Sequence, residues 1–219
     1  LSKVVTPKNK VDYQRLEYII RVAVRLMDNM ITINKYPFSE IKEMTEKTRK
    51  IGLGIMGFAD MLLKLGIPYN SEEALKLGER IMKFINQKAL YYSQKLAKKR
   101  GSFPTYTQSI YTTKKIAPPR NATRTAIAPT GTLSILAHCS SGIEPIFAFV
   151  YKKNILDGDG ILEYNSHFLS IAKKRGFYSE ELMKKVSRVG SIQNVAEIPE
   201  DVKRVFITAR DITPDWHIK

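Results

Sequence analysis

Residues Arg120–Phe147 read RNATRTAIAPTGTLSILAHCSSGIEPIF, and the fold of the chain is decided here. Thr123–Ala128 (TRTAIA) is short and rich in β-prone residues, which predicts a strand. Pro129-Thr130-Gly131 then forms a tight turn, and the apolar run Ile135–Ala137 indicates that a helix begins. The stretch therefore predicts a strand, a turn and a helix in direct succession.

The start of this helix is a candidate anion site. A helix N-terminus leaves about four backbone N–H groups unpaired and carries a partial positive charge, which suits phosphate. Gly131 lets a ligand approach the backbone, Thr130, Thr132 and Ser134 add hydroxyl groups, and Pro129 fixes the entry. The alternative is an ordinary helix start capped by a hydroxyl. The turn is not a Walker P-loop, because no Lys follows Gly131 at the required place.

Three residues beyond the turn were candidates for chemistry. We expect Cys139 to be a buried, inert thiol and Glu144 to act structurally, by capping or by pairing with an arginine. His138 has no second histidine or cysteine at ligand spacing, so the sequence predicts no metal site.

The remaining chain predicts mostly helices. Apolar residues recur at helical spacing from Asp12 to about Lys35, Ser39 caps a short charged helix to about Lys47, and an apolar run covers Ile55–Leu65. Asn70, with Glu73 three residues later, predicts the cap of a long helix that reaches Lys99. Further predictions are a loop at Ser102–Arg120, helices near Leu162–Lys174 and Ser179–Arg188, and a helix start at Thr213–Trp216.

The composition leaves two classes of function open. The formal net charge is +15, which is compatible with nucleic acid, acidic membranes or anionic small substrates, or with a lysine-rich solvated surface. The basic residues are spread along the chain without a nucleic-acid motif, so nucleic-acid binding is the less favoured interpretation. A single cysteine excludes an internal disulfide, and the absence of a long apolar stretch favours a cytoplasmic protein that binds no membrane.

Several motifs, in order, resemble the large chain of ribonucleotide reductase. Arg120–Phe147 is similar to the family's R-N-(A or S)-T strand, phosphate-gripping turn and S-S-G-I-E-P element. Arg49–Leu65 (RKIGLGIMGFADMLLKL) resembles its glycine-punctuated helix, Leu1-Ser2-Lys3 resembles a segment that follows a redox cysteine, and Asp215-Trp216-His217 resembles the opening of its next motif. The PTGT form of the turn resembles that of the adenosylcobalamin-dependent (class II) enzymes.

The resemblance implies an α/β fold in which residues 1–219 form a helix-rich part of a ten-stranded barrel. It implies replacement of the ribose 2′-hydroxyl by hydrogen through a thiyl radical, for DNA precursor synthesis. It places the substrate phosphates on one short segment, namely Pro129, Thr130, Gly131, Thr132 and Leu133, with Ser134 possible.

The same resemblance implies adenosylcobalamin as cofactor, a ribonucleoside diphosphate as substrate and an external dithiol such as thioredoxin as reductant. The family's radical-bearing cysteine and partner cysteines match no position here, so we expect no catalytic residue in this segment and no activity from it alone. We expect it to work with the remaining segments of the reductase. The alternative, from another class, is a basic helical module that binds nucleic acid or an assembly partner.

Overall fold

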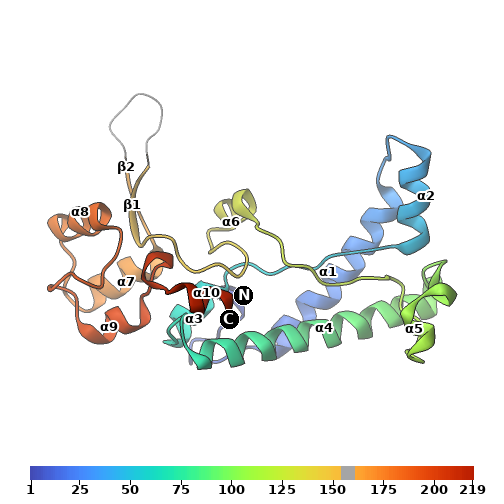
Figure 1. Cartoon of the computed structure of the whole chain (residues 1–219), viewed down its shortest axis with the longest axis horizontal. Helices are drawn as coiled ribbons and strands as arrows, with labels where there is room; N and C mark the ends of the chain where they lie inside the picture. Colours follow the sequence, from blue (N-terminus) through green and yellow to red (C-terminus); the bar gives the residue numbers. More distant parts are fainter. Residues whose placement is uncertain (154–160) are drawn as a thin grey trace. The chain divides into compact units, whose positions relative to one another are not determined.

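The computed structural model describes residues 1–153 and 161–219. These residues divide into two compact units. Unit 1 comprises Leu1–Val11, Ile55–Leu77 and Pro129–Lys219, and unit 2 comprises Asp12–Gly54 and Gly78–Ala128. In chain order the elements are η1 (Ser2–Val4), α1 (Tyr13–Ile33), α2 (Ser39–Thr48), α3 (Phe58–Leu65), α4 (Glu72–Arg100), η2 (Tyr106–Gln108), α5 (Ile110–Thr113), α6 (Gly131–Ala137), β1 (Val150–Lys153), β2 (Ile161–Tyr164), α7 (Ser166–Lys174), α8 (Glu180–Val189), α9 (Glu200–Val205), η3 (Ala209–Asp211) and α10 (Pro214–Ile218) (Figure 1).

Unit 2 is built on the two long helices α1 and α4. Asp12 caps α1, because its Oδ1 accepts the Arg15 N–H at 2.9 Å. Leu16, Ile20 and Val24 on α1 and Ile81 and Ile85 on α4 are buried and form much of the apolar core. Glu17 on α1 also joins the two helices. Its carboxylate accepts a hydrogen bond from the Tyr92 hydroxyl at 2.9 Å and forms an ion pair with Lys88 Nζ at 2.8 Å, and both partners lie on α4.

A buried ionic cluster ties the elements of unit 2 together. The Asp28 carboxylate on α1 is 0% exposed. Its Oδ1 accepts from Arg49 Nε at 2.9 Å and from Asn121 Nδ2 at 3.1 Å, and its Oδ2 accepts from Arg100 Nη1 at 3.1 Å. Arg120 Nε lies 3.4 Å from Oδ1, and burial and the nearby Arg49 lower the Arg120 pKa. One carboxylate thus orients three guanidinium groups from separate segments.

The prediction of a strand at Thr123–Ala128 is wrong, because this segment pairs in parallel with the segment before Gly54 only through a single bridge, Leu53↔Thr125. Leu53 N–H donates to Arg124 O at 2.8 Å, and Ala126 N–H donates to Leu53 O at 3.2 Å. Gly52 is required here, because a Cβ at this position would lie 2.9 Å from the Ala126 Cβ.

Unit 1 packs its helices around three phenylalanines. The rings of Phe149, Phe168 and Phe206 lie with centroids 5.3–5.9 Å apart and are buried with Met183, Ile192 and other apolar side chains. The strands β1 and β2 form an antiparallel pair in which Val150 faces Tyr164 and Lys153 faces Ile161. A separate parallel bridge joins Ile146 to Thr208.

The structure confirms the helix-rich character and corrects several boundaries. The predicted helix at Leu162–Lys174 is wrong at its start, since Ile161–Tyr164 is the strand β2. The α7 helix begins after Asn165, whose Oδ1 accepts the N–H groups of His167 and Phe168. The loop predicted at Ser102–Arg120 contains η2 and α5.

The predicted cap of α4 is also wrong by one residue. Ser71 rather than Asn70 caps the helix, and its Oγ accepts the Ala74 N–H at 3.1 Å. Asn70 and Ser71 are both good capping residues by type. Ser71 is the cap because the helical backbone begins at Glu72, the residue that follows it.

A closed barrel is not formed by the described residues alone, in which the only sheet is the two-stranded β1–β2 pair. Across residues 1–153 and 161–219, no helix combines the length and the apolar character that crossing a bilayer requires.

Candidate functional site

The predicted turn lies at the start of α6, where the backbone makes a sharp change of direction. Thr130 is the residue before the helix and adopts a left-handed conformation, with φ of 54°. The first hydrogen bond of the helix is donated by Ser134 N–H to Thr130 O at 2.8 Å. Among the described residues, the N–H groups of Gly131, Thr132 and Leu133 have no hydrogen-bond partner.

These three residues are exposed in the described part of the chain. A Cβ built on Gly131 would meet none of the described atoms within 4 Å. Gly131 is also helical, not left-handed, so the fold of this segment does not require a glycine here. A ligand held against the backbone is a physical reason for glycine at this position.

A second turn, Ser140–Gly142, holds the first one in place. Ser141 Oγ donates to Pro129 O at 2.6 Å, and Gly142 N–H donates to Thr130 Oγ1 at 2.8 Å. Because these bonds act on Thr130 and on the residue before it, they support the unfavourable left-handed conformation of Thr130.

The second turn is itself anchored to α3 by a buried carboxylate. Ser140 N–H donates to Asp60 Oδ2 at 2.6 Å, and Gly57 N–H donates to Ser140 O at 2.8 Å. His167 Nε2 lies 3.9 Å from Asp60 Oδ1, and burial lowers the pKa of this histidine. The sequence interpretation missed Asp60, although a lone carboxylate inside the apolar run Ile55–Leu65 was a signal for it.

The hydroxyl groups of the candidate phosphate-binding residues are either unpaired or already engaged within the turn. Thr132 Oγ1 makes no hydrogen bond within the described part of the chain and is exposed with its own N–H. Ser134, in contrast, is buried, and its Oγ lies 2.8 Å from Gly131 O and 3.3 Å from Ser141 Oγ. The Ser134 hydroxyl is therefore engaged inside the turn, as is that of Thr130.

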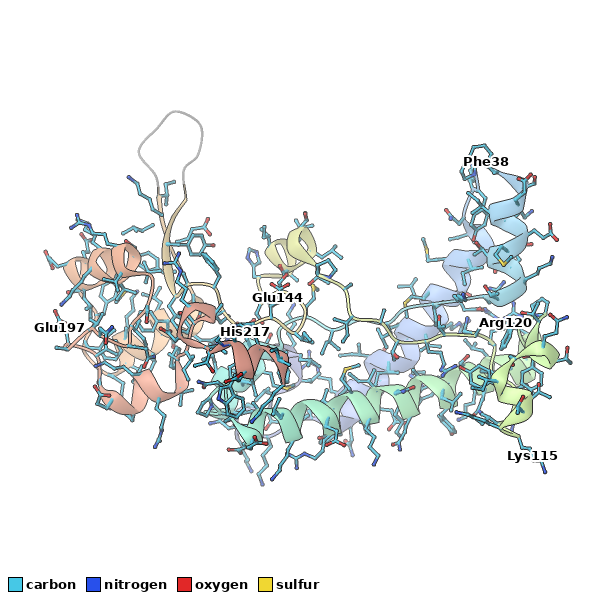
Figure 2. The ribbon with its side chains drawn as sticks, in the orientation of Figure 1. Phe38, Lys115, Arg120, Glu144, Glu197 and His217 are labelled. Carbon is cyan, nitrogen blue, oxygen red and sulfur yellow. The ribbon has the colours of Figure 1, made fainter. Side chains whose placement is uncertain are left out.

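The three residues beyond α6 also have defined places. Cys139 is only partly buried, contrary to the expectation of a buried thiol, and burial together with the Asp60 charge raises its pKa, which disfavours the thiolate. Glu144, which is labelled in Figure 2, is exposed, and among the described residues it forms no ion pair with an arginine. His138 ends α6 in a left-handed conformation. No three His, Cys, Asp or Glu side chains gather into a metal-binding group within the residues described.

Comparison with known proteins decides the family. The family model described as "Ribonucleotide reductase, barrel domain" matches residues 1–219. The chain belongs to the ribonucleotide reductase barrel-domain family. This membership favours the reductase interpretation over a basic helical module that binds nucleic acid.

Three relatives define the similarity. The chain is 50% identical over 218 residues to the vitamin B12-dependent ribonucleoside-diphosphate reductase of Thermoplasma acidophilum, covering 100% of this chain and 28% of that protein. It is 44% identical over 210 residues to the protein of the same description from Mycobacterium tuberculosis, covering 96% and 30%. Identity falls to 29% over 248 residues with the ribonucleoside-diphosphate reductase subunit alpha of Chlamydia pneumoniae, covering 96% and 24%.

Among solved structures, the class Id ribonucleotide reductase alpha subunit of Actinobacillus ureae is similar, with a TM-score of 0.67 and 26% identity. The match covers 88% of this chain and 34% of that one. The chain thus spans less than a third of the length of the curated relatives named here.

Proposed function

We propose that these 219 residues supply the substrate-phosphate turn of a vitamin B12-dependent ribonucleoside-diphosphate reductase. In this proposal the β-phosphate and α-phosphate of the substrate accept hydrogen bonds from the N–H groups of Gly131, Thr132 and Leu133. Thr132 Oγ1 adds a fourth donor. Pro129, Thr130 and Ser134 position the turn. The Pro129 carbonyl and the Thr130 hydroxyl accept hydrogen bonds from the second turn, and the Ser134 hydroxyl donates to Gly131 O.

The observation that carries the proposal is the set of three free, exposed N–H groups beside a glycine that the protein fold does not require. Convergent backbone donors at a helix start are suited to a phosphate without any charged side chain in the turn. The net charge of +15 favours a dianionic or trianionic ligand over a neutral one.

The complete enzyme is proposed to replace the ribose 2′-hydroxyl by hydrogen through a thiyl radical, yielding DNA precursors. The hydroxyl leaves as water, and two cysteine thiols supply two hydrogens and become a disulfide. An external dithiol such as thioredoxin then reduces that disulfide. In this proposal Cys139 takes no part in the chemistry, because none of the family's radical-bearing or redox cysteines matches its position.

Adenosylcobalamin is the cofactor proposed for the complete enzyme, because the relatives from Thermoplasma acidophilum and Mycobacterium tuberculosis are vitamin B12-dependent reductases. A corrin ring supplies four nitrogens to its cobalt, so the protein would contribute at most one axial side chain, and the half-buried His167 already has Asp60 as its neighbour at 3.9 Å. We therefore assign cofactor binding to the remaining segments of the reductase and derive no step through it.

We also propose that the barrel closes only with those remaining segments. The extended residues around Leu53 and Thr125 pair with each other in parallel, as do those around Ile146 and Thr208. Each such pair is suited to accept a further parallel strand along an edge, as a barrel requires.

A Thr132→Val substitution tests the proposed donor role in the complete reductase. Valine keeps the shape of threonine and removes only the hydroxyl, so we expect the Kd for a ribonucleoside diphosphate to rise by about tenfold. Isothermal titration would measure this Kd beside that of the nucleoside without phosphates, whose binding should not change.

Thr113→Val is the matched control, because Thr113 is exposed at the end of α5 and its hydroxyl makes no hydrogen bond within the described residues. An unchanged diphosphate affinity in Thr132→Val would show that the Thr132 hydroxyl does not contact the phosphates.

A further inference from the structure

The helix α6, at whose start the proposed phosphate turn lies, is not held in place by apolar packing within the described residues. It has seven residues, and among them only Ser134 is buried. Its apolar side chains Leu133, Ile135 and Leu136 are all exposed in the described part of the chain. A helix this short is marginal in water without tertiary packing. The direction of its first N–H groups therefore depends on the hydrogen bonds that reach the turn.

Those hydrogen bonds come from the second turn, Ser140–Gly142. Among the described residues, every hydrogen bond that reaches Pro129 or Thr130 from outside α6 involves Ser141 or Gly142. The two shortest are the bond from Ser141 Oγ to Pro129 O, at 2.6 Å, and the bond from Gly142 N–H to Thr130 Oγ1, at 2.8 Å. The residue that fixes the second turn therefore also fixes the phosphate turn.

Ser140, the first residue of the second turn, has all of its polar groups bound by the start of α3. Its N–H donates to Asp60 Oδ2 at 2.6 Å, and its hydroxyl oxygen accepts the Asp60 N–H at 3.3 Å. Its carbonyl accepts the Gly57 N–H at 2.8 Å. These residues belong to the same compact unit, and two of the three bonds are made by Asp60.

The Asp60 carboxylate is buried among apolar side chains. Asp60 is 4% exposed, and its neighbours on α3, Ala59 and Met61, are buried as well. Removing a carboxylate from water costs free energy, which short charge-assisted hydrogen bonds and a helix N-terminus offset. His167 Nε2 is too far from Asp60 Oδ1, at 3.9 Å, for a hydrogen bond. The short bond to Ser140 therefore favours a role for Asp60 in holding the second turn.

We propose that Asp60 is a positioning residue for the substrate phosphates. It fixes the second turn, and the second turn holds Thr130 in its left-handed conformation. The three N–H groups that follow Thr130 then keep the direction in which they bind the phosphates together. Asp60 acts only through these bonds and does not itself contact the substrate. The inference rests on the proposed function, because it assigns the phosphates to the same turn.

Asp60→Leu in the complete reductase removes the acceptor and keeps a side chain of similar size. The KM for a ribonucleoside diphosphate should rise by about tenfold, because a loosened turn is no longer pre-organised for the phosphates, while kcat should change less than about threefold. A loss of folded enzyme alone would give the opposite pattern, a lower kcat at an unchanged KM. Turnover measured over a range of diphosphate concentrations separates the two patterns.

Asp60→Asn is the conservative variant, because its amide oxygen can still accept the Ser140 N–H. Its KM should stay within about twofold of that of the unmodified enzyme. Ser179→Ala is the matched control, because Ser179 Oγ accepts the Leu182 N–H in the same compact unit, and among the described residues no hydrogen bond joins it to either turn. It should leave KM unchanged. A KM in Asp60→Asn as high as that in Asp60→Leu would overturn the proposed hydrogen-bond route.

The Ser134 amide reports on the turn without any ligand, because its N–H donates to Thr130 O at 2.8 Å. Its hydrogen exchange should be several-fold faster in ligand-free Asp60→Leu enzyme and unchanged in Asp60→Asn and Ser179→Ala. Unchanged exchange in Asp60→Leu would overturn the positioning role. Faster exchange with an unchanged KM would instead contradict the phosphate turn, and with it the part of Asp60 in substrate binding.

Ser141→Ala tests the same route if Asp60→Leu is too unstable to purify. It removes only the hydroxyl that donates to Pro129 O and leaves the buried carboxylate in place. The KM for the diphosphate should rise by about threefold, and exchange of the Ser134 amide should be faster. Unchanged KM and unchanged exchange in Ser141→Ala would show that the second turn does not hold the first, and would overturn the proposal.

Discussion

Replacing Asp28 by alanine is expected to destabilise unit 2 by about 3–5 kcal/mol. The substitution leaves the Arg49 guanidinium buried without its carboxylate, and it frees Arg100 and Arg120 to repel each other. A buried charge that loses its partner costs much more than the ion pair contributes as a pair. Hydrogen exchange of α1 and α4 peptides under increasing urea measures this local stability.

Glu43→Ala is the control for this prediction. Glu43 forms an ion pair with Lys47 on the surface of α2, where both side chains are largely exposed. Loss of such a pair changes stability by roughly 0–1 kcal/mol. If Asp28→Ala shifted the exchange of α1 no more than Glu43→Ala does, the cluster would not be the element that joins these segments.

Gly131→Ala is expected to weaken diphosphate binding about 10- to 100-fold while leaving the protein as stable or more stable. The new Cβ meets no protein atom, and alanine favours a helical conformation over glycine by roughly 0.4–1 kcal/mol. Because no described residue contacts the methyl group, the proposal expects it to disturb the ligand held against the N–H groups of residues 131–133. Opposite changes in affinity and stability are therefore the signature of a binding glycine.

Thermal unfolding and diphosphate titration of the same preparation check both parts. Leu136→Ala is the matched control, because Leu136 lies in the last turn of α6 and is 73% exposed. It should change stability little, because an exposed leucine packs little and alanine is at least as good a helix former, and it should leave the diphosphate Kd unchanged. A Gly131→Ala protein with unchanged affinity would mean that the phosphates lie elsewhere.

Local chemistry made much of the fold predictable. The helices predicted from Asp12 and from Ser179 both form, and Gly190 ends the second in a left-handed conformation. The predicted Ser39 cap is wrong, because Ser39 is the first residue of α2 and its hydroxyl donates to the Glu40 carboxylate. The strand β2 was missed although its partner, Val150–Lys153, lies just before it in the sequence, because a strand of four residues is too short to be distinguished by periodicity from the helix that follows. Asn165, which decides where α7 begins, lies inside the segment predicted as helix.

The candidate site was predictable only in part, because some of its contacts join residues that are far apart in the sequence. The turn, Gly131 and Thr132 stand next to one another in the sequence, so their pattern alone suggested an anion site. Asp60 reaches Ser140 across 80 positions, and no local pattern predicts such a contact. The buried Ser134 hydroxyl donates to Gly131 O, and the residue type alone does not predict that the side chain points into the turn.

Amide hydrogen exchange at residues 131–133 of the complete reductase tests the proposed phosphate turn most directly. The exchange is measured without ligand, with saturating ribonucleoside diphosphate and with the same nucleoside lacking phosphates. The proposal predicts slower exchange at Gly131, Thr132 and Leu133 with the diphosphate and no change with the nucleoside. Unchanged exchange at all three amides in the diphosphate-saturated enzyme would contradict it.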